Sequence, residues 1–218
     1  MKNPNFNTYK TEKSLENYSK KAELTGIEYF LVNKYFKSPI IDIGCGTGRT
    51  TKCLFDRGFD VIGVEIVKRM VKKARSLFPK IRFYVGDAAN LKFRDSSFNT
   101  AFFSFNGPDY IFPEKKRIEA FKEISRVLRK GGLFVFSSHN PNALFLRLRP
   151  RFLLRNLKGK RLFSRYKIER QPFGELLTHY MSPKKQISII EKNTDLKFLR
   201  LHRKSLRDIH PHYVFVKK

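Results

Sequence analysis

The sequence predicts an α/β fold in which a mostly parallel, seven-stranded sheet is covered by helices on both faces. Between residues 40 and 140, short apolar runs alternate with longer amphipathic stretches, a pattern typical of parallel strands joined by helices. The short runs are apolar at consecutive positions, as expected for strands buried on both faces. Glycine or proline follows the amphipathic stretches, at positions where helices commonly end.

The individual elements follow from the same patterns. Strands are expected at residues 40–43, 60–65, 81–85, 98–105, 133–138, 196–202 and 213–216, and helices at residues 22–36, 47–57, 67–78, 113–128 and 182–193. The basic turn before Gly131 suits the end of a helix, and Ser182 with Pro183 suits the start of the last one. We therefore expect an N-terminal helical segment at residues 1–36 and one domain at residues 37–218.

Composition narrows the class of protein. Of the 218 residues, 41% are hydrophobic, which is enough for a full core at this length. No apolar run approaches the roughly 18 to 20 residues of a membrane span. Residues 1–18 lack the apolar core of a secretory signal, so a cytoplasmic protein is expected. Cys45 and Cys53 form no CxxC pair and lie near no histidine cluster, so no metal site is expected.

The net charge is unusual. Lys and Arg number 46 against 19 Asp and Glu, which gives a formal charge of +27. A field of that sign attracts nucleic acid, anionic lipid surfaces and phosphorylated molecules. The alternative is a lysine-rich surface that serves solubility alone. The charge therefore bears on association and does not predict the fold.

The segment IIDIGCGTGR at residues 40–49 is the most informative part of the sequence. A strand leads into a turn with glycines at 44, 46 and 48, and a helix with free backbone N–H groups follows. Arg49 stands where a dinucleotide fingerprint has its third glycine, so a pyrophosphate site is not expected. The carboxylate of Asp42 suits an ammonium group better than a phosphate, because like charges repel.

Two further acids follow the next two strands. Glu65 lies at the end of the second strand, where a carboxylate can accept hydrogen bonds from both hydroxyls of a ribose. Asp87 follows the third strand, where it can accept from the exocyclic amine of a base. Open α/β sheets bind ligands along this edge. Together with Asp42, these acids indicate a nucleoside that carries an amino acid and no phosphates.

These residues resemble the motifs of the class I S-adenosylmethionine-dependent methyltransferases, in particular the type 11 and type 25 domains. The similar segments are residues 42–48, Glu65, residues 86–88 and the basic turn at 126–132. The resemblance covers residues 38–140 well and the last two strands loosely. It implies a Rossmann-like fold and an enzyme that uses S-adenosyl-L-methionine.

The resemblance also implies the roles of single residues. The loop would hold the methionine part of the cofactor, Glu65 the ribose and Asp87 the adenine amine. Ile66 would pack on the adenine. The loop at residues 104–107 would close over the sulfonium, and an N-terminal aromatic would cover the cofactor. The expected cofactor-binding residues are Tyr18, Asp42, Gly44, Cys45, Gly46, Gly48, Glu65, Ile66, Asp87, Ala88, Phe105 and Asn106.

The methyl acceptor is expected beyond the fourth and fifth strands. The cofactor carries the reactive group, so a general base is needed only where the acceptor must lose a proton. His139 is the best base by its chemistry, with Asn106 as the second catalytic candidate. The alternative for His139 is a partly buried histidine that bonds to the backbone. Other candidates are Asp109, Tyr110 and Asn140, and His179 and Tyr180, for which packing is favoured.

Residues 141–170 carry ten Lys or Arg and a single Glu, mixed with Leu and Phe. They belong to an expected substrate-recognition insertion at about residues 141–181. It is a lid whose arginines bind an anionic acceptor, a peripheral membrane surface, an RNA-binding face, or a solvated basic helix pair that covers the core. The sequence favours the lid and the basic pair.

The function predicted first is in-line methyl transfer to a small or lipid-linked acceptor, including anionic ones. The first alternative is an RNA methyltransferase that uses the basic surface. Residues 105–110 read FNGPDY and depart from the Asn/Asp-Pro-Pro-aromatic box of related enzymes that methylate DNA base amines, so that activity is disfavoured. A cofactor-binding protein without turnover is disfavoured by the intact glycines and acids, and a nicotinamide-dependent oxidoreductase by Arg49.

Overall fold

The computed structural model describes residues 4–19, 23–141, 153–154, 156–157, 164–203 and 208–218. Its elements in chain order are α1 (Asn5–Tyr9), α2 (Glu12–Ser19), α3 (Gly26–Tyr35), β1 (Ile40–Ile43), α4 (Arg49–Asp56), β2 (Val61–Glu65), α5 (Lys68–Leu77), β3 (Arg82–Val85), β4 (Phe98–Phe103), the short 3₁₀ helix η1 (Gly107–Tyr110), α6 (Glu114–Val127), β5 (Leu128–Ser137), β6 (Tyr166–Gln171), β7 (Gly174–His179), α9 (Pro183–Asn193), β8 (Leu196–His202) and β9 (His212–Lys217).

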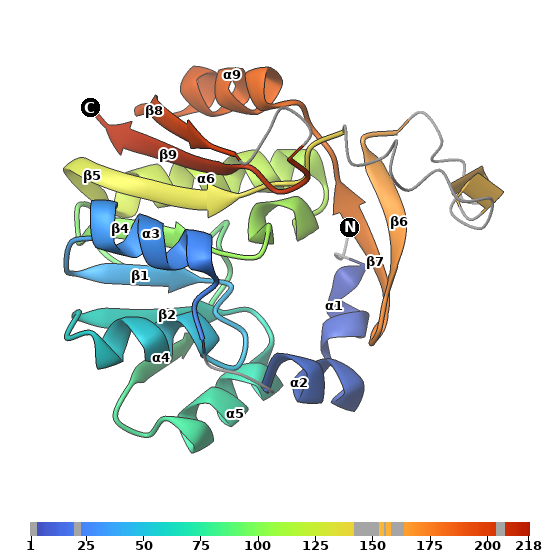
Figure 1. Ribbon diagram of the computed structural model, residues 1–218, viewed down its shortest axis with the longest axis horizontal. Helices are drawn as coiled ribbons and strands as arrows, with labels where there is room; N and C mark the ends of the chain where they lie inside the picture. The colour runs from blue at the N-terminus through green and yellow to red at the C-terminus, as the bar shows by residue number, and fades with distance from the viewer. Residues whose placement is uncertain (1–3, 20–22, 142–152, 155, 158–163, 204–207) are drawn as a thin grey trace.

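Seven strands form one sheet in the order β3-β2-β1-β4-β5-β9-β8. The strands β1 to β5 pair in parallel, whereas β9 is antiparallel to both β5 and β8. The predicted fold class and the mostly parallel seven-stranded sheet are thus confirmed. In Figure 1 the arrowheads of β1, β2 and β5 point toward the side where α1, α2 and the β6–β7 pair stand, so the carboxyl ends of these strands meet there.

Helices cover both faces of the sheet because its strands alternate between two cores. On one face, Ile41 and Ile43 pack in a cluster with side chains of α6 and α9 such as Phe121 and Ile190. On the other face, Ile40 packs with residues of α3 and α4. The period of two along β1 therefore decides which neighbours each side chain meets.

The start of β5 differs from the sequence prediction. The helix was expected to end at residue 128, and α6 ends at Val127, but the strand expected from residue 133 already begins at Leu128. Leu128 pairs with Phe98 of β4, and the register then shifts before Thr100. Gly131 adopts a φ of +76° within this irregular stretch. The glycine therefore serves an irregularity at the start of a strand, which local helix-stop rules do not distinguish from a helix end.

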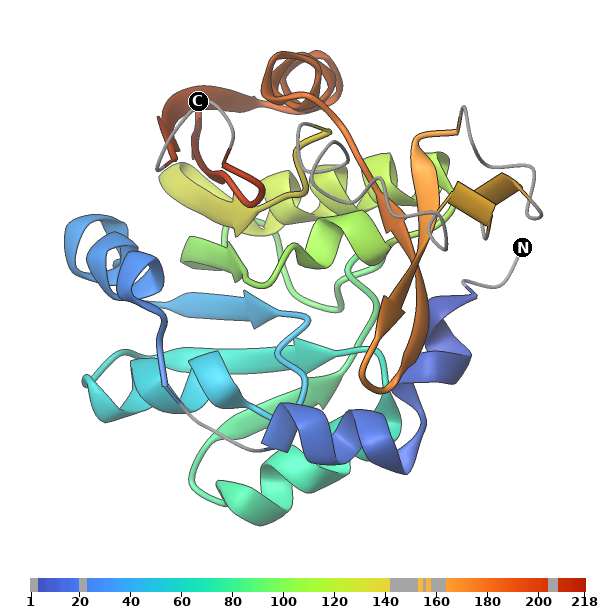
Figure 2. The same ribbon diagram turned by 45° about the vertical axis from the view of Figure 1, so that its right-hand side comes forward.

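Two structures on the open side of the sheet go beyond the individual elements predicted. One is the pair of short helices α1 and α2, which lie within the N-terminal helical segment expected at residues 1–36, and the other is the antiparallel hairpin of β6 and β7, which was not expected. Figure 2 shows the hairpin standing beside both helices. The buried side chain of Asn5 joins them, because it donates to the carbonyl of Leu177 (2.8 Å) and accepts from the N–H of Leu177 (2.6 Å).

Candidate active site

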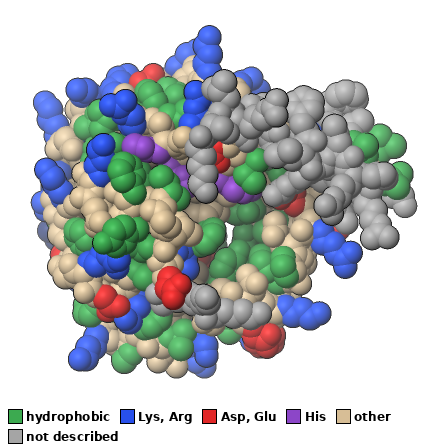
Figure 3. Space-filling view, in the orientation of Figure 1, with side chains coloured by type: hydrophobic (Ala, Val, Ile, Leu, Met, Phe, Trp, Pro, Cys, Tyr) green, Lys and Arg blue, Asp and Glu red, His purple; other side chains and the backbone are tan. Residues whose placement is uncertain are grey.

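A cavity of about 1150 Å³ lies at the carboxyl ends of the parallel strands. Its walls come from the loops after β1 to β5, from α1 and α2, and from the turn of the β6–β7 hairpin. Figure 3 shows hydrophobic side chains around the hollow and a histidine side chain above it. Ligand pockets in proteins usually measure about 300 to 1,000 Å³, so this space suits two ligands that meet.

The glycine-rich loop forms one wall of the cavity. Gly44, Gly46 and Gly48 have φ angles of +63°, +57° and +95°, a region that side chains other than glycine rarely adopt. A Cβ on Gly44 would lie 2.6 Å from the ring of Phe103. The loop therefore needs glycine for its conformation and for its packing, and it presents backbone to the cavity.

Glu65 stands at the end of β2, where it faces both the loop and the cavity. One carboxylate oxygen accepts from the backbone N–H of Gly46 (3.2 Å) and the other from that of Val67 (2.9 Å). Burial raises the pKa of this carboxyl above its ordinary value. Each oxygen of a carboxylate has a second lone pair, so Glu65 can hold the loop and still accept from two ligand hydroxyls.

The end of β3 supplies the next part of the wall. Asp87 accepts from the backbone N–H of Ala89 (3.0 Å) and pairs with Lys116 on α6 (2.6 Å). Ile66 follows Glu65 and is 41% exposed in the wall of the cavity. An exposed apolar side chain beside a carboxylate suits a flat base that carries an amine.

Asp42 lies beneath the loop, on the α4 side of the sheet. Its Oδ2 accepts from the hydroxyls of Thr50 (2.5 Å) and Thr51 (2.7 Å), and its Oδ1 has no hydrogen-bond partner among the described residues. Burial raises the pKa of the Asp42 carboxyl to about 6. The strand alternation of β1 turns this side chain away from the cavity, so its direct role is to tie β1 to the start of α4.

Arg49 is engaged by the protein itself. Its guanidinium donates to both carboxylate oxygens of Glu28 at 2.8 and 2.7 Å, and it stacks over the ring of Phe105 at 4.2 Å. Burial opposes ionisation of Glu28, but the bonds from Arg49 lower the pKa of that carboxyl below its ordinary value. The cation at the end of the loop is thus neutralised and is not a phosphate grip.

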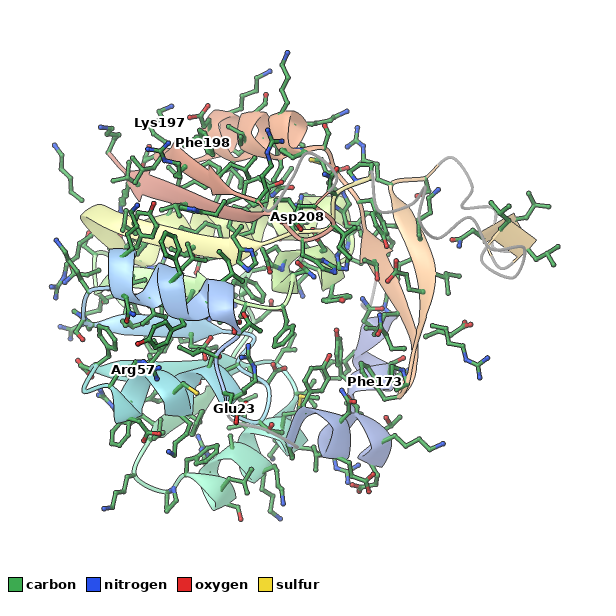
Figure 4. All side chains as sticks on the ribbon, in the orientation of Figure 1. Glu23, Arg57, Phe173, Lys197, Phe198 and Asp208 are labelled. Carbon is green, nitrogen blue, oxygen red and sulfur yellow. The ribbon has the colours of Figure 1, made fainter. Side chains whose placement is uncertain are left out.

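Aromatic side chains from three segments form the opposite wall. Tyr9 of α1 lies 6.1 Å from Tyr18, 6.1 Å from Tyr110 and 6.2 Å from Phe173, measured between ring centroids. Figure 4 shows Phe173 at the turn of the hairpin, next to α2. Burial raises the pKa of Tyr18 to about 12. This wall is therefore apolar and carries neutral hydroxyls.

A hydrogen-bonded acid and imidazole lie beyond the ends of β4 and β5. The Nδ1 of His139 is 3.0 Å from Oδ2 of Asp109, and the backbone N–H of His139 donates to the same oxygen at 2.5 Å. His139 lines the cavity, whereas Asp109 is fully buried behind it. The imidazole is therefore the part of this pair that a ligand can reach.

Asn106 completes this part of the site. Its amide Nδ2 lies 3.5 Å from Nε2 of His139 and 2.9 Å from Nδ1 of His210. Both Phe105 and Asn106 have positive φ angles, 47° and 57°, which is uncommon outside glycine. Gly107 follows, where a Cβ would lie 1.8 Å from the ring of Phe103. The turn after β4 is thus held in one uncommon conformation beside His139.

Comparison with known proteins agrees with this geometry. Residues 40–132 match a family model described as a methyltransferase domain. This stretch contains the glycine-rich loop, Glu65 and Asp87. The chain is 33% identical over 120 residues to a demethylmenaquinone methyltransferase of Paenarthrobacter aurescens, covering 54% of this chain and 46% of the relative. It is 36% identical over 105 residues to a 2-methyl-6-phytyl-1,4-hydroquinone methyltransferase of Synechocystis, covering 46% of this chain and 32% of the relative.

Solved structures share the fold over nearly the whole chain. A SAM-dependent methyltransferase of Methanosarcina mazei superposes with a TM-score of 0.71 at 23% identity, covering 89% of this chain and 98% of the other. A Pyrococcus horikoshii protein gives a TM-score of 0.70 at 21% identity, covering 96% and 95%. At this identity the likeness concerns the fold. The chain spans less than half the length of the two curated relatives named above.

Most of the residues predicted from the sequence do meet in the methyltransferase domain. Of the twelve expected cofactor residues, ten line the cavity, namely Tyr18, Gly44, Cys45, Gly46, Glu65, Ile66, Asp87, Ala88, Phe105 and Asn106. Asp42 and Gly48 do not line it. Gly48 instead packs where a Cβ would meet Phe83 at 2.8 Å. Both still shape the loop, and their contact with a cofactor remains a prediction.

The acceptor-side candidates separate into two groups. His139, Asn106 and Tyr110 line the cavity. His179 and Tyr180 are buried behind it and pack near Asp109 and His139, while Asn140 donates to the carbonyl of Asp208 (3.1 Å) in the segment before β9. Their position agrees with the packing role that was favoured for the pair at 179–180.

Several residues that line the cavity were not singled out from the sequence, among them Tyr9, Phe173 and His210. Tyr9 lies on α1, Phe173 lies at the turn of the hairpin, and His210 precedes β9. The antiparallel direction of β9 offered a signal for His210, because the start of β9 must lie beside the end of β5. No comparable signal marks the other two.

The part of the chain that the structure describes supports neither metal ligation nor a membrane-spanning helix. Among the described residues, no group of three or more His, Cys, Asp or Glu side chains is placed to hold a metal ion. In the same part of the chain, no helix has the length and apolar character needed to cross a bilayer. The side chains of Cys45 and Cys53 are both buried. Most of the basic stretch at 141–170 lies outside the described residues, and its proposed roles stay predictions.

Proposed function

We propose that this chain binds S-adenosyl-L-methionine and transfers its methyl group to a small or lipid-linked acceptor held in the same cavity. The observation that carries the proposal is the Glu65 carboxylate beside the glycine-rich loop at residues 44–46. A buried acid that keeps free lone pairs suits ribose hydroxyls. Arg49 is occupied by Glu28, which disfavours a pyrophosphate.

The residues present fit the cofactor part by part. The loop at residues 44–46 would hold the methionine part, and Ile66 would lie on the adenine, with Asp87 and Ala88 at its edge. Tyr18 would cover the cofactor from the N-terminal side. Bound here, S-adenosylmethionine would supply a methyl group on a positively charged sulfur.

The other half of the cavity would take the acceptor. The chain positions the acceptor and keeps water away, which can contribute about 7 to 11 kcal/mol in favourable cases. His139 is proposed as the general base and Asn106 as its neighbour beside the reacting atoms. The curated relatives named above carry names that include menaquinone and phytyl-hydroquinone compounds, and these names support a small or lipid-linked acceptor.

A thermal-shift series tests the proposal. The midpoint of unfolding should rise with S-adenosylmethionine and with its demethylated product, since a ligand of the folded state stabilises it by mass action. NAD should leave the midpoint unchanged. The double variant Glu65→Ala with Asp42→Ala should lose both responses. Stabilisation by NAD alone would overturn the proposal.

A further inference from the structure

We propose that Asp109 and His139 act as a proton-accepting pair for an aromatic hydroxyl, so that the methyl acceptor is the oxygen of a phenol-like molecule. The inference rests on the proposed function and deepens it by naming the acceptor class. His139 is the group that touches the acceptor. Asp109 acts through His139 and is a positioning residue.

The groups around Asp109 determine whether its carboxyl is ionised. Burial alone would raise the pKa of its carboxyl, but the imidazoles of His139 and His179 and the guanidinium of Arg117 hold that pKa well below its usual range. Arg117 and His179 are themselves fully buried, 3.6 and 3.7 Å from Oδ1 of Asp109. Asp109 is therefore a carboxylate at neutral pH.

The carboxylate of Asp109 fixes the tautomer of His139. An ionised carboxylate only accepts hydrogen bonds, and Oδ2 of Asp109 lies 3.0 Å from Nδ1 of His139. The ring proton of neutral His139 is therefore on Nδ1. The lone pair is on Nε2, the ring nitrogen that approaches Asn106 beside the cavity. This nitrogen is the one able to take a proton from a ligand.

Hydrogen bonds from neighbouring residues hold Asp109 and His139 in one arrangement. The hydroxyl of Ser138 donates to Oδ1 of Asp109 (3.0 Å), and the backbone N–H of His139 donates to Oδ2. Arg117 is held in turn by the carbonyl of Pro108 (3.1 Å). The carboxylate cannot rotate without losing these bonds, so the imidazole is held in one orientation. Such pre-organisation is what a general base requires and what a merely buried histidine does not.

The side chains that line the cavity indicate the chemical class of the acceptor. Lys10 lines the cavity, where Arg49 and Lys116 are paired with Glu28 and Asp87, and a sulfonium near Lys10 disfavours an ammonium substrate. The rings of Tyr9, Tyr18, Tyr110 and Phe173 favour a flat aromatic molecule. A phenol has a pKa of about 10, so it gives up its proton to an imidazole more readily than an aliphatic alcohol does. An aromatic hydroxyl satisfies all three conditions.

The step balances with groups already named. As the acceptor O–H bond breaks, its proton goes to Nε2 of His139, and the freed electron pair on oxygen forms the new bond to the methyl carbon. The bond between that carbon and the sulfonium sulfur breaks, and its electron pair stays on sulfur. Asp109 stabilises the resulting imidazolium. The products are a methyl ether and the neutral thioether.

The wild-type chain offers a test that needs no variant of the buried acid. Nitrogen-15 NMR of the histidine rings should show that the neutral ring of His139 carries its proton on Nδ1 and not on Nε2. With S-adenosylhomocysteine bound, added 4-nitrophenol should ionise at a lower pH than it does free in solution, because Nε2 takes its proton. Protonation of Nε2 in free neutral His139, or 4-nitrophenol that ionises as in solution, would overturn the inference.

Variants separate the roles of the two residues. His139→Gln should remove the lowering of the pH at which bound 4-nitrophenol ionises, and it should lower methylation by about 10²- to 10⁴-fold. Asp109→Asn should move the His139 ring proton away from Nδ1 and lower the ionisation of the bound probe. A matched control is His202→Gln, a histidine that bonds to Tyr35 away from the cavity, and it should behave as wild type. Equal ionisation in His139→Gln and wild type would contradict the inference.

The failure of this inference and the failure of the proposed function look different. Loss of S-adenosylmethionine binding by the wild-type chain would remove the proposed function itself. If S-adenosylmethionine binds but bound 4-nitrophenol ionises at the same pH as in solution, only the aromatic-hydroxyl acceptor is removed. Methylation of 4-nitroaniline in preference to 4-nitrophenol would have the same consequence. Both are read from the same preparation, by calorimetry and by absorbance.

Discussion

The two halves of the cavity are built in different ways. Apart from Tyr18, the cofactor half comes mainly from one stretch of the chain, because the loop after β1, Glu65 and Asp87 all lie at the ends of neighbouring strands. The acceptor half is assembled from distant segments. Asn5 bonds to Leu177, 172 residues away, and Asn106 lies beside His210, 104 residues away. Local sequence therefore specifies the first half, whereas tertiary packing specifies the second.

The acids of the two halves also differ. In the cofactor half, burial raises the pKa of Asp42 and of Glu65, and no cation is within salt-bridge distance of either in the described structure. In the acceptor half, Asp109 is surrounded by His139, His179 and Arg117, which lower its pKa. The difference indicates that Glu65 is available for ligand donors, while Asp109 is already engaged and acts through the imidazole.

The largest expected effect comes from Glu65→Ala. Two charge-assisted hydrogen bonds to ribose are worth about 1.5 to 3 kcal/mol each, so the Kd for S-adenosylmethionine should rise at least about 100-fold. Isothermal titration calorimetry measures this directly. The exposed Glu119→Ala on α6 is the control and should bind normally. Equal affinity in Glu65→Ala and wild type would remove the distinction between the two halves.

Asp42→Asn tests the raised pKa of the cofactor half. The folded-state pKa of Asp42 is about 6 against an ordinary 3.8. Between about pH 4 and pH 6 the unfolded chain releases this proton while the folded chain keeps it, so the contribution of Asp42 to stability falls as the pH rises.

The variant lacks this loss. Its free energy of unfolding, relative to wild type, should therefore rise by up to about 3 kcal/mol from pH 4 to pH 6. Urea denaturation at several pH values measures the difference, with the exposed Asp195→Asn as the control. A difference that stays constant with pH would show that Asp42 is ionised as easily in the fold as in the unfolded chain.

Gly107→Ala tests the turn that joins the two halves. The new Cβ would lie 1.8 Å from the ring of Phe103, and overpacking of this kind costs about 1 to 3 kcal/mol. The melting temperature should fall accordingly. Gly26→Ala is the matched control, because a Cβ there meets no atom within 4 Å. An unchanged melting temperature in Gly107→Ala would show that Phe103 moves aside freely.

Asn5→Ala gives the smallest expected effect and is confined to the acceptor half. Loss of the side chain leaves the buried N–H and carbonyl of Leu177 without these partners, which costs about 1 to 3 kcal/mol. Because Asn5 makes the buried hydrogen bonds between α1 and β7, whereas the bond from Thr8 to the carbonyl of Glu175 is exposed, cleavage of residues 4–19 by protease should become faster. The exposed Asn7→Ala on the same helix should not change the rate. Equal rates in both variants would mean that Asn5 does not tie α1 to β7.

The different origins of the cofactor half and the acceptor half explain which parts of the site could be predicted from the sequence. The alternating strands, Glu65 and the glycine loop carry local signals, because a strand end and the turn after it lie within a few residues of one another. The hairpin of β6 and β7 lies in a basic stretch whose pattern suggested a lid or helix pair. Tyr9 and Phe173 reach the cavity only through contacts between distant segments, which no local pattern encodes. His139 was found by its chemistry, but its partner Asp109 became evident only from the packing of η1 against the end of β5.

A crystal structure of the chain with S-adenosylhomocysteine tests the central claim most directly, since that claim is that one ligand spans the border between the two halves. The account predicts ribose hydroxyls about 2.5 to 3.0 Å from the oxygens of Glu65, the amino-acid part along residues 44–46, and the sulfur turned toward His139 and Asn106. A vacant cavity, or a ligand bound elsewhere with Glu65 free, would contradict it.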